Sequence, residues 1–309
     1  MKQKKYIGLT YGDPASIGPE ILLKTLKRWN TSRWKQKFKP LVIGRQDSLI
    51  KKYKPGKPSI SSGTHAYKCL KEAVDLAKEK KVTAIVTGPV SKEYINLANI
   101  KFVGQTEEIA KLCNINPDNV IMLFVANDLK IALFTRHIPL KLVSKKLNRK
   151  NLENFISLLN AELKKWFQIK SPKIAVLGLN PHAGENGLFG NEEKKIILPI
   201  IKSLNLKGLK ISGPLSADAT LAKAGQNYLS GKKQNYDAYI SFYHDQALPM
   251  FKAVCGMDGV NVTLGLPFLR ASVDHGTAFD IAGKNKADNN GLISAVMLVE
   301  KLLCKDEDC

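Results

Sequence analysis

Short apolar runs alternate with helix-like segments along the chain, and this alternation limits the possible folds more than any other feature. The apolar run at residues 5–11 precedes a helical segment that reaches about residue 29, and a helical period at 64–81 precedes another apolar run at 82–90. Apolar runs of this length, without polar alternation, are typical of strands buried on both faces. The pattern therefore predicts an α/β fold in which helices cover both sides of a largely parallel sheet.

The length, at 309 residues, is more than one hydrophobic core usually supports, so two packed domains are expected. No apolar run reaches the roughly 18 residues that a membrane span requires. The N-terminal residues MKQKKYIGLTYGDP lack the apolar segment of a secretion signal. The five cysteines include no C-x-x-C motif, which indicates neither a disulfide framework nor a cysteine zinc site. We therefore expect a cytoplasmic protein that makes no membrane contact.

The formal net charge of +21 raises a non-enzymatic alternative, a basic protein that binds nucleic acid or phosphate. Such a protein would bind DNA or RNA in a salt-sensitive manner and would need no metal. However, most basic residues are lysines, which are spread over helix-like segments and are not interleaved with aromatic residues. This distribution favours a solvated lysine surface, so we expect no nucleic-acid partner. A basic surface would still attract an anionic substrate.

Three of the five histidines follow apolar, strand-like runs: His137, His182 and His244. The ends of strands in a parallel or mixed sheet can gather such side chains at one edge. Neutral imidazoles are good ligands for zinc and other divalent metals, and three protein ligands leave positions open for a substrate oxygen. The spacings of 45 and 62 residues match no short metal motif, and each histidine has an ordinary loop or core role as its alternative. The residues alone therefore leave the two interpretations open.

Polar residues near these histidines are candidates for acid–base and anion-binding roles. A metal beside a substrate hydroxyl would stabilise the alkoxide, and a base must accept the proton. Asp218 and Lys252 are the candidate bases, with a plain ion pair as the alternative for each. Asn261 lies at the start of the strand-like run VNVTLGLPFL, and Arg270 directly follows its end. The guanidinium fork fits a carboxylate or phosphate, although a salt bridge at the strand end is the alternative.

Loops that follow strands often bind phosphate groups, but neither G-x-G-x-x-G nor G-x-x-x-x-G-K-[ST] occurs in this chain. GDPASIGPE follows the first strand-like run and fits either a phosphate cradle or a simple turn. The segment FVGQTEEI begins a helix, where Thr106 fits either a helix cap or a ligand contact. These loops therefore identify no cofactor by themselves.

Longer motifs carry a resemblance that the single residues do not. They are GDPASIGPE, TGPVSK, FVGQTEE, LNPHAGENGLFG, GPLSADAT, SFYHDQALPMFK and GVNVTLGLPFLRASVDHGTAFDIAG. Together they resemble the 4-hydroxythreonine-4-phosphate dehydrogenases of vitamin B6 biosynthesis along nearly the whole chain. The segment HGTAFDIAGKNKADN also resembles the coenzyme loop of isopropylmalate and isocitrate dehydrogenases, which bind nicotinamide cofactors without the usual glycine motif.

The resemblance implies a fold and a role for each candidate residue. The fold is two α/β domains with a cleft between them, residues 1–125 with 270–309 on the coenzyme side and 126–269 on the metal, substrate and dimer side. The implied ligands of a divalent metal (Zn, Mg, Co or Mn) are His137, His182 and His244. The implied substrate-binding residues are Gln105, Thr106, Lys252, Asn261 and Arg270. The implied NAD or NADP contacts are His275, Gly276, Thr277, Ala278, Asp280, Gly283 and Asn285.

The implied reaction oxidises the 3-hydroxyl of 4-phosphohydroxy-L-threonine and then releases carbon dioxide. It yields 3-amino-2-oxopropyl phosphate, which pyridoxine 5'-phosphate synthase consumes, and the implied enzyme is a homodimer whose active sites draw on both subunits. Two positions depart from the family pattern: Gln105 replaces a usual histidine, and Ser16 replaces a usual glycine. Glutamine can donate to an anion but carries no charge. Because relatives oxidise four-carbon sugar-acid phosphates, threonate or erythronate 4-phosphate is the alternative substrate.

Overall fold

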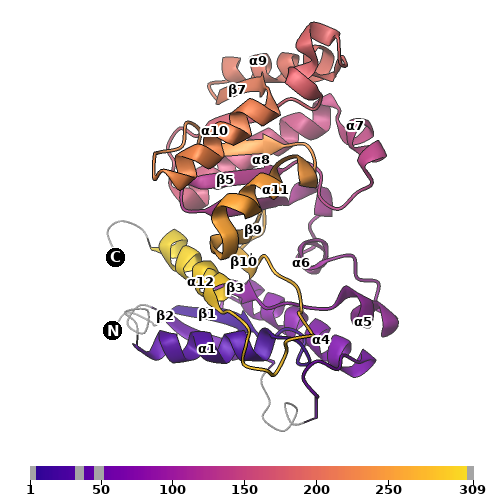
Figure 1. Ribbon diagram of the computed structural model, residues 1–309, viewed down its shortest axis with the longest axis vertical. Coiled ribbons are helices and arrows are strands. Elements are labelled where there is room, and N and C mark those ends of the chain that lie inside the picture. The colour runs from indigo at the N-terminus through magenta and orange to yellow at the C-terminus, as the bar shows by residue number, and fades with distance from the viewer. Residues whose placement is uncertain (1–4, 32–37, 45–51, 305–309) are drawn as a thin grey trace. The chain divides into compact units, whose positions relative to one another are not determined.

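The computed structural model describes residues 5–31, 38–44 and 52–304, and its chain forms two compact α/β units (Figure 1). The first unit contains residues 1–120 and 260–309, and the second contains residues 121–259. Each unit has its own strands, helices and hydrophobic core. The predicted α/β class is confirmed.

The first unit is built on five strands in the order β2-β1-β3-β10-β9. All neighbours are parallel except β10 and β9, which are antiparallel. In chain order the strands are β1 (Lys5–Thr10), β2 (Phe38–Ile43), β3 (Ala84–Thr87), β9 (Val260–Leu264) and β10 (Leu269–Val273). β3 and β10 are buried along their whole lengths, as expected for strands covered on both faces.

The helices of the first unit are α1 (Gly18–Thr31), α4 (Ile60–Lys78), α5 (Lys92–Leu97), α6 (Gln105–Leu112) and α12 (Asn290–Leu303). Helices α4 and α12 pack on these strands, and α5 and α6 pack on α4. Helix α4 buries Ala66, Cys69, Leu70 and Ala73, whose spacing of three and four residues places them on one face. Ser59 caps its N-terminus reciprocally with Ser62, which stabilises the helix by about 1 kcal/mol.

The second unit is also built on five strands, in the order β4-β5-β8-β6-β7. β4 and β5 form an antiparallel hairpin, and the remaining neighbours are parallel. The strands are β4 (Ile121–Ala126), β5 (Leu129–Leu133), β6 (Lys173–Leu177), β7 (Lys210–Leu215) and β8 (Ala238–Ser241). The helices are α7 (Val143–Lys146), α8 (Arg149–Phe167), α9 (Leu198–Leu206), α10 (Ala217–Leu229) and α11 (His244–Cys255).

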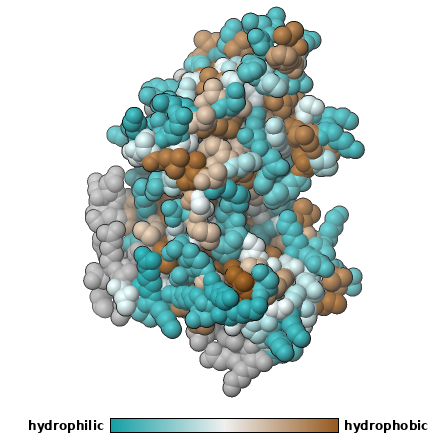
Figure 2. All heavy atoms as spheres, viewed as in Figure 1, coloured by the Kyte–Doolittle hydropathy of each residue, from teal (hydrophilic) through white to brown (hydrophobic). Residues whose placement is uncertain are grey.

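The surface and the cysteines add further constraints. Hydrophilic residues dominate the face in Figure 2, where hydrophobic residues occur in small groups. Among the helices of the described residues, none combines the length and the apolar composition that a bilayer span requires.

Burial raises the pKa of the Cys69 and Cys255 thiols to about 12, so neither is a ready nucleophile at neutral pH. Cys304 takes part in a disulfide bond, which the cysteine spacing had not indicated.

Candidate active site

Two strand-end loops of the first unit pack against each other. The amide of Asp13, after β1, donates to the Pro89 carbonyl, after β3, at 2.9 Å. The Gly88 amide donates to Thr10 Oγ1 at 2.9 Å. Gly12 has a φ of 71°, and a Cβ there would lie 2.5 Å from the Pro89 oxygen. Only glycine therefore fits at position 12, because both the backbone conformation and the close approach exclude a side chain.

Ser16 stabilises the turn that leads into α1. Its Oγ donates to the Asp13 carbonyl at 2.6 Å and accepts from the Gly18 amide at 2.9 Å. Its φ lies outside the left-handed region. The turn therefore does not need the glycine that the family usually has, and the serine satisfies an amide of the first helical turn instead.

Arg270 is the central cation of the first unit. It lies on β10 and is only 2% exposed. Its guanidinium donates to Thr263 Oγ1 at 3.0 Å, Thr87 Oγ1 at 2.8 Å and Gln105 Oε1 at 3.3 Å. These three oxygens come from β9, from the end of β3 and from the start of α6. The fold thus brings together residues that are far apart in the sequence.

The Arg270 guanidinium is buried without a carboxylate partner at ion-pair distance within the described residues. Burial lowers its pKa to about 10, an effect that the charge of Glu107 opposes, so the side chain remains charged at neutral pH. Within the same described part of the chain, the buried Arg270 Nε and Asn261 Oδ1 have no hydrogen-bond partner. A buried cation and unpaired polar atoms destabilise the fold unless a ligand satisfies them. The arrangement is therefore suited to receive an anion.

Gln105 hydrogen-bonds to Arg270 and to the loop after β3. Its Nε2 donates to the Gly88 carbonyl at 3.1 Å while its Oε1 accepts from Arg270, so both ends of the amide are bound. Thr106 is buried in the first turn of α6 and does not cap the helix, because the N-cap residue is Gly104 and no side chain caps that end. Backbone amides at such an end favour anions. Thus Gln105, Thr106, Asn261 and Arg270 are all in the first unit, whereas Lys252 is exposed on α11 of the second.

Two of the three predicted metal ligands lie side by side in the second unit. The chain beyond β5 bonds to the chain beyond β8, where Thr135 Oγ1 donates to the Phe242 carbonyl at 2.6 Å. This pairing brings the His137 and His244 ring centroids to 5.5 Å. Two imidazoles on one tetrahedral Zn²⁺ have centroids about 5 Å apart. His244 Nδ1 also lies 2.5 Å from an Asp245 carboxylate oxygen, an arrangement that orients a histidine to ligate through Nε2.

His182 lies apart from this pair. It is exposed on the turn after β6 and contacts the Phe189 ring. The described residues include no group of three histidine, cysteine, aspartate or glutamate side chains that could hold a metal ion. The 5.5 Å separation of the His137 and His244 rings is compatible with a shared metal ion, and ligation by all three histidines stays a prediction.

The turn that carries His182 has an unusual backbone. Residues 182–186 all have positive φ, with values of 50°, 53°, 77°, 39° and 56°, and so form a left-handed turn. The buried Glu193 carboxylate holds its entrance, accepting from the Asn180 amide at 2.7 Å and from Asn180 Nδ2 at 3.0 Å. Left-handed residues other than glycine each cost about 1–2 kcal/mol. Neighbouring contacts must therefore hold this turn in place, and the sequence did not indicate it.

The two candidate bases are both exposed. Asp218 accepts a short hydrogen bond from Ser216 Oγ, which together with the Ala219 amide lowers the pKa of the carboxyl below its ordinary value. At neutral pH Asp218 is thus ionised, but the lowered pKa makes it a weaker base than an ordinary carboxylate. Lys252 follows His244 by two turns of α11. The base role remains a prediction for both.

All the residues predicted to bind coenzyme lie in the loop between β10 and α12. The loop is tied to the β1–α1 turn, because the Ile17 amide donates to the Thr277 carbonyl at 3.0 Å. Ala278, Gly283 and Asn285 adopt positive φ. Within the described residues, the buried His275 Nε2 has no hydrogen-bond partner. The predicted residues in this loop are His275, Gly276, Thr277, Ala278, Asp280, Gly283 and Asn285.

Comparisons with known proteins show the family to which the chain belongs. The model of the family "Pyridoxal phosphate biosynthetic protein PdxA" matches residues 9–299. A 4-hydroxythreonine-4-phosphate dehydrogenase of Sulfurihydrogenibium sp. (strain YO3AOP1) is 37% identical over 94% of this chain and 96% of its own. A D-threonate 4-phosphate dehydrogenase of Pectobacterium atrosepticum is 36% identical over 96% of this chain and 99% of its own.

Solved structures give the same result. The crystal structure of a 4-hydroxythreonine-4-phosphate dehydrogenase from Klebsiella pneumoniae has a TM-score of 0.79 and 33% identity, covering 96% of this chain and 97% of that one. An isocitrate dehydrogenase from Methylococcus capsulatus, at 13% identity and a TM-score of 0.52 over 97% of this chain and 86% of that one, shares the fold alone. The resemblance inferred from the motifs is confirmed, and the chain belongs to the family of the pyridoxal phosphate biosynthetic protein PdxA.

Proposed function

We propose that this protein is a NAD- or NADP-dependent dehydrogenase that oxidises the 3-hydroxyl of 4-phosphohydroxy-L-threonine. The observation that carries the proposal is the buried Arg270 guanidinium, which hydrogen-bonds only to neutral oxygens and keeps Nε unpaired in the described part of the chain. The phosphate or carboxylate of the substrate is the anion that compensates this charge. Asn261, on the adjacent strand β9, binds the same substrate, as do Gln105, Thr106 and Lys252.

The reaction is an oxidation followed by a decarboxylation. Hydride leaves the substrate carbon for the nicotinamide, and Asp218 or Lys252 accepts the hydroxyl proton. The resulting 2-amino-3-oxo acid phosphate loses carbon dioxide and becomes 3-amino-2-oxopropyl phosphate. This product is the substrate of pyridoxine 5'-phosphate synthase, so the enzyme acts in pyridoxal 5'-phosphate biosynthesis. The names of the similar dehydrogenases support this substrate.

A divalent metal (Zn, Mg, Co or Mn) belongs to the proposal. His137 and His244 would hold it, with His182 as the third ligand, and their imidazoles favour the transition metals among these candidates. Once bound, the cation supplies stabilisation of negative charge on the substrate oxygen. The proposal also includes a cytoplasmic homodimer whose active sites draw on both subunits.

The coenzyme binds in the β10–α12 loop under this proposal. The first unit, residues 1–120 with 260–309, then forms the coenzyme side of the enzyme, and the second unit, residues 121–259, forms the metal and dimer side. The loop has one buried imidazole nitrogen without a partner among the described residues, at His275, which a ligand could satisfy. The left-handed residues Ala278 and Asn285 show that the loop holds a specific conformation, as a preformed ligand site requires.

A second substrate has a specific observation in its favour. Gln105 stands where the family usually has histidine, and its amide is already bound at both ends, to Gly88 and Arg270. It therefore adds no charge to the site. A relative of nearly equal identity is named D-threonate 4-phosphate dehydrogenase. Threonate or erythronate 4-phosphate, which lacks the ammonium group of the amino acid, is the alternative substrate.

One experiment tests both substrates. The reduction of NAD⁺ and of NADP⁺ is followed by absorbance in the presence of each candidate metal. 4-Phosphohydroxythreonine is compared with threonate 4-phosphate and erythronate 4-phosphate at equal concentrations. We expect turnover of 4-phosphohydroxythreonine. Turnover restricted to a sugar-acid phosphate would exclude the vitamin B6 role, and no reduction with any of them, combined with salt-sensitive DNA or RNA binding, would favour the non-enzymatic alternative.

Metal binding has its own test in single histidine variants. His244→Ala and His182→Ala are each expected to lower Co²⁺ affinity at least about tenfold, because each removes a proposed ligand. Co²⁺ absorption spectra and the metal content of the purified protein measure the effect. His65→Ala is the matched control, since His65 lies in the first unit and hydrogen-bonds the Gly44 carbonyl. Wild-type metal content in His182→Ala would remove that residue from the ligand set.

A further inference from the structure

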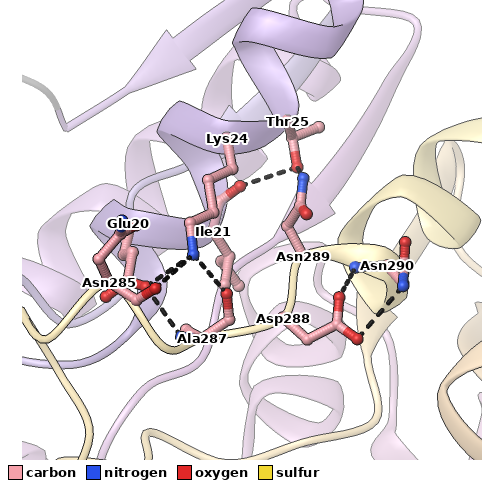
Figure 3. A network of polar contacts seen from close by, with 9 residues as sticks. All are labelled: Glu20, Ile21, Lys24, Thr25, Asn285, Ala287, Asp288, Asn289 and Asn290. Carbon is pink, nitrogen blue, oxygen red and sulfur yellow. Dashed lines mark hydrogen bonds and ion pairs between the residues drawn. The ribbon is translucent and has the colours of Figure 1, made fainter.

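Helix α1 holds the end of the β10–α12 loop through two side chains that the sequence did not single out (Figure 3). Glu20 and Lys24 form an ion pair at 2.9 Å on adjacent turns of α1. Lys24 Nζ also donates to the carbonyls of Asn285, at 3.2 Å, and Ala287, at 2.7 Å. An ammonium group has three donors, so these three acceptors use all of them.

The Ala287 peptide is held from both sides. Its amide donates to Glu20 Oε1 at 2.8 Å, and its carbonyl accepts from Lys24. The Glu20 side chain is 13% exposed and the Lys24 side chain 31%, so solvent screens this network only in part. Partial burial raises the pKa of Glu20, but the hydrogen bonds from Lys24 and the Ala287 amide outweigh it and lower the pKa below its ordinary value. The carboxylate is therefore ionised at neutral pH.

The residue directly before α1 also holds the loop near its beginning. The Ile17 amide, immediately before α1, donates to the Thr277 carbonyl at 3.0 Å. Between these two attachments the loop contains Gly283, whose φ is 75° and whose position admits no Cβ because Pro55 lies 2.6 Å away. A helix is rigid compared with a loop, so α1 acts as a template that sets the distance between the two ends.

We propose that Glu20 and Lys24 are positioning residues for the dinucleotide, which they stabilise without touching it. The inference rests on the proposed function, because it assigns residues 275–285 to the coenzyme. Each loop residue that must be ordered on binding reduces affinity, since its conformational freedom is lost. The Glu20–Lys24 clamp restricts residues 285–287 before the coenzyme arrives, and so removes part of this cost.

The test compares charge-matched variants on one helix. Lys24→Met keeps most of the apolar stem but removes the three donors, and is expected to raise the Kd of NADH or NADPH about tenfold. Glu20→Gln retains an oxygen that can accept from the Ala287 amide, so this variant is expected to raise the Kd of the dinucleotide less than Lys24→Met does. Lys27→Met removes the same charge from an exposed position of α1 and serves as the control. Fluorescence titration of the reduced dinucleotides measures Kd, and hydrogen exchange measures the Ala287 amide.

The outcomes separate this inference from the proposed function. We expect Lys24→Met to raise the KM of the dinucleotide with kcat and the KM of the phosphorylated substrate within twofold, and to accelerate exchange at Ala287. A wild-type enzyme that binds a dinucleotide while Lys24→Met binds it equally well would overturn the inference alone. If Lys24→Met loses affinity equally for the dinucleotide and for the phosphorylated substrate and also has a lower Tm, the inference is overturned, because such a result indicates general destabilisation. A wild-type enzyme that binds neither dinucleotide would overturn both proposals.

Discussion

Replacement of Arg270 by methionine is expected to lower kcat/KM by about 10³-fold while leaving the folded state as stable as the wild type or more stable. The loss follows from removing the buried cation that receives the substrate anion, an interaction of the kind worth roughly 2–5 kcal/mol. The unchanged or higher stability of the variant is expected because the buried guanidinium destabilises the wild-type fold. A guanidinium at 2% exposure, with neutral partners at Thr87, Thr263 and Gln105, has lost its hydration without gaining a carboxylate. Steady-state kinetics and thermal unfolding measure the two effects.

Arg270→Lys is the informative companion variant. Lysine retains the charge but lacks the planar fork, so it cannot reach Thr87 and Thr263 in the same geometry. We expect it to recover part of the activity, with the remaining defect mainly in the KM of the phosphorylated substrate. Wild-type kcat/KM in Arg270→Met would refute the anion-binding role. A large drop in Tm would show instead that the guanidinium is mainly a structural residue.

Much of the fold could be predicted because its signals are local. The apolar run at 5–11 corresponds to β1, and the helical period at 64–81 corresponds to α4. Buried strands and amphipathic helices produce such patterns from neighbouring residues alone. The segment that begins at His244 was harder to predict, because it forms helix α11 although the helix contains Pro249. A proline inside a helical pattern usually signals an end, and here tertiary packing overrides that preference.

The site was predictable in its residue types but not in its contacts. A scarce arginine after a strand-like run pointed to Arg270, although that run forms two strands, β9 and β10, and Arg270 lies near the start of β10. Its partners Thr87 and Thr263 are ordinary strand residues with no distinguishing pattern. The contact between Gln105 and Arg270 joins positions 165 residues apart, which only the sheet order can bring together. Likewise, Glu20 and Lys24 resemble any helical ion pair in sequence. Their role depends on a loop that lies more than 260 residues away.

The left-handed turn at His182 was unpredictable for a different reason. His182, Ala183 and Glu185 have no intrinsic preference for positive φ, and a run of five such residues is disfavoured for L-amino acids. Asn180 and Glu193 hold the turn, and Gly178 permits it, because a Cβ at that position would lie 2.6 Å from Ala183 Cα. Strain that persists in this way is common at functional sites.

Gly184→Val is expected to destabilise the protein by about 3 kcal/mol, because Gly184 lies at the centre of this turn with a φ of 77°. A Cβ there would lie 2.7 Å from Glu193 Oε2 and would displace the carboxylate that holds Asn180. Asn186→Gly, at an exposed position of the same turn with a φ of 56°, should be neutral or stabilising by up to about 1 kcal/mol, since it relieves strain. Calorimetric unfolding of both variants measures the difference. Similar Tm values for the two would show that the turn is neither strained at Asn186 nor closely packed at Gly184.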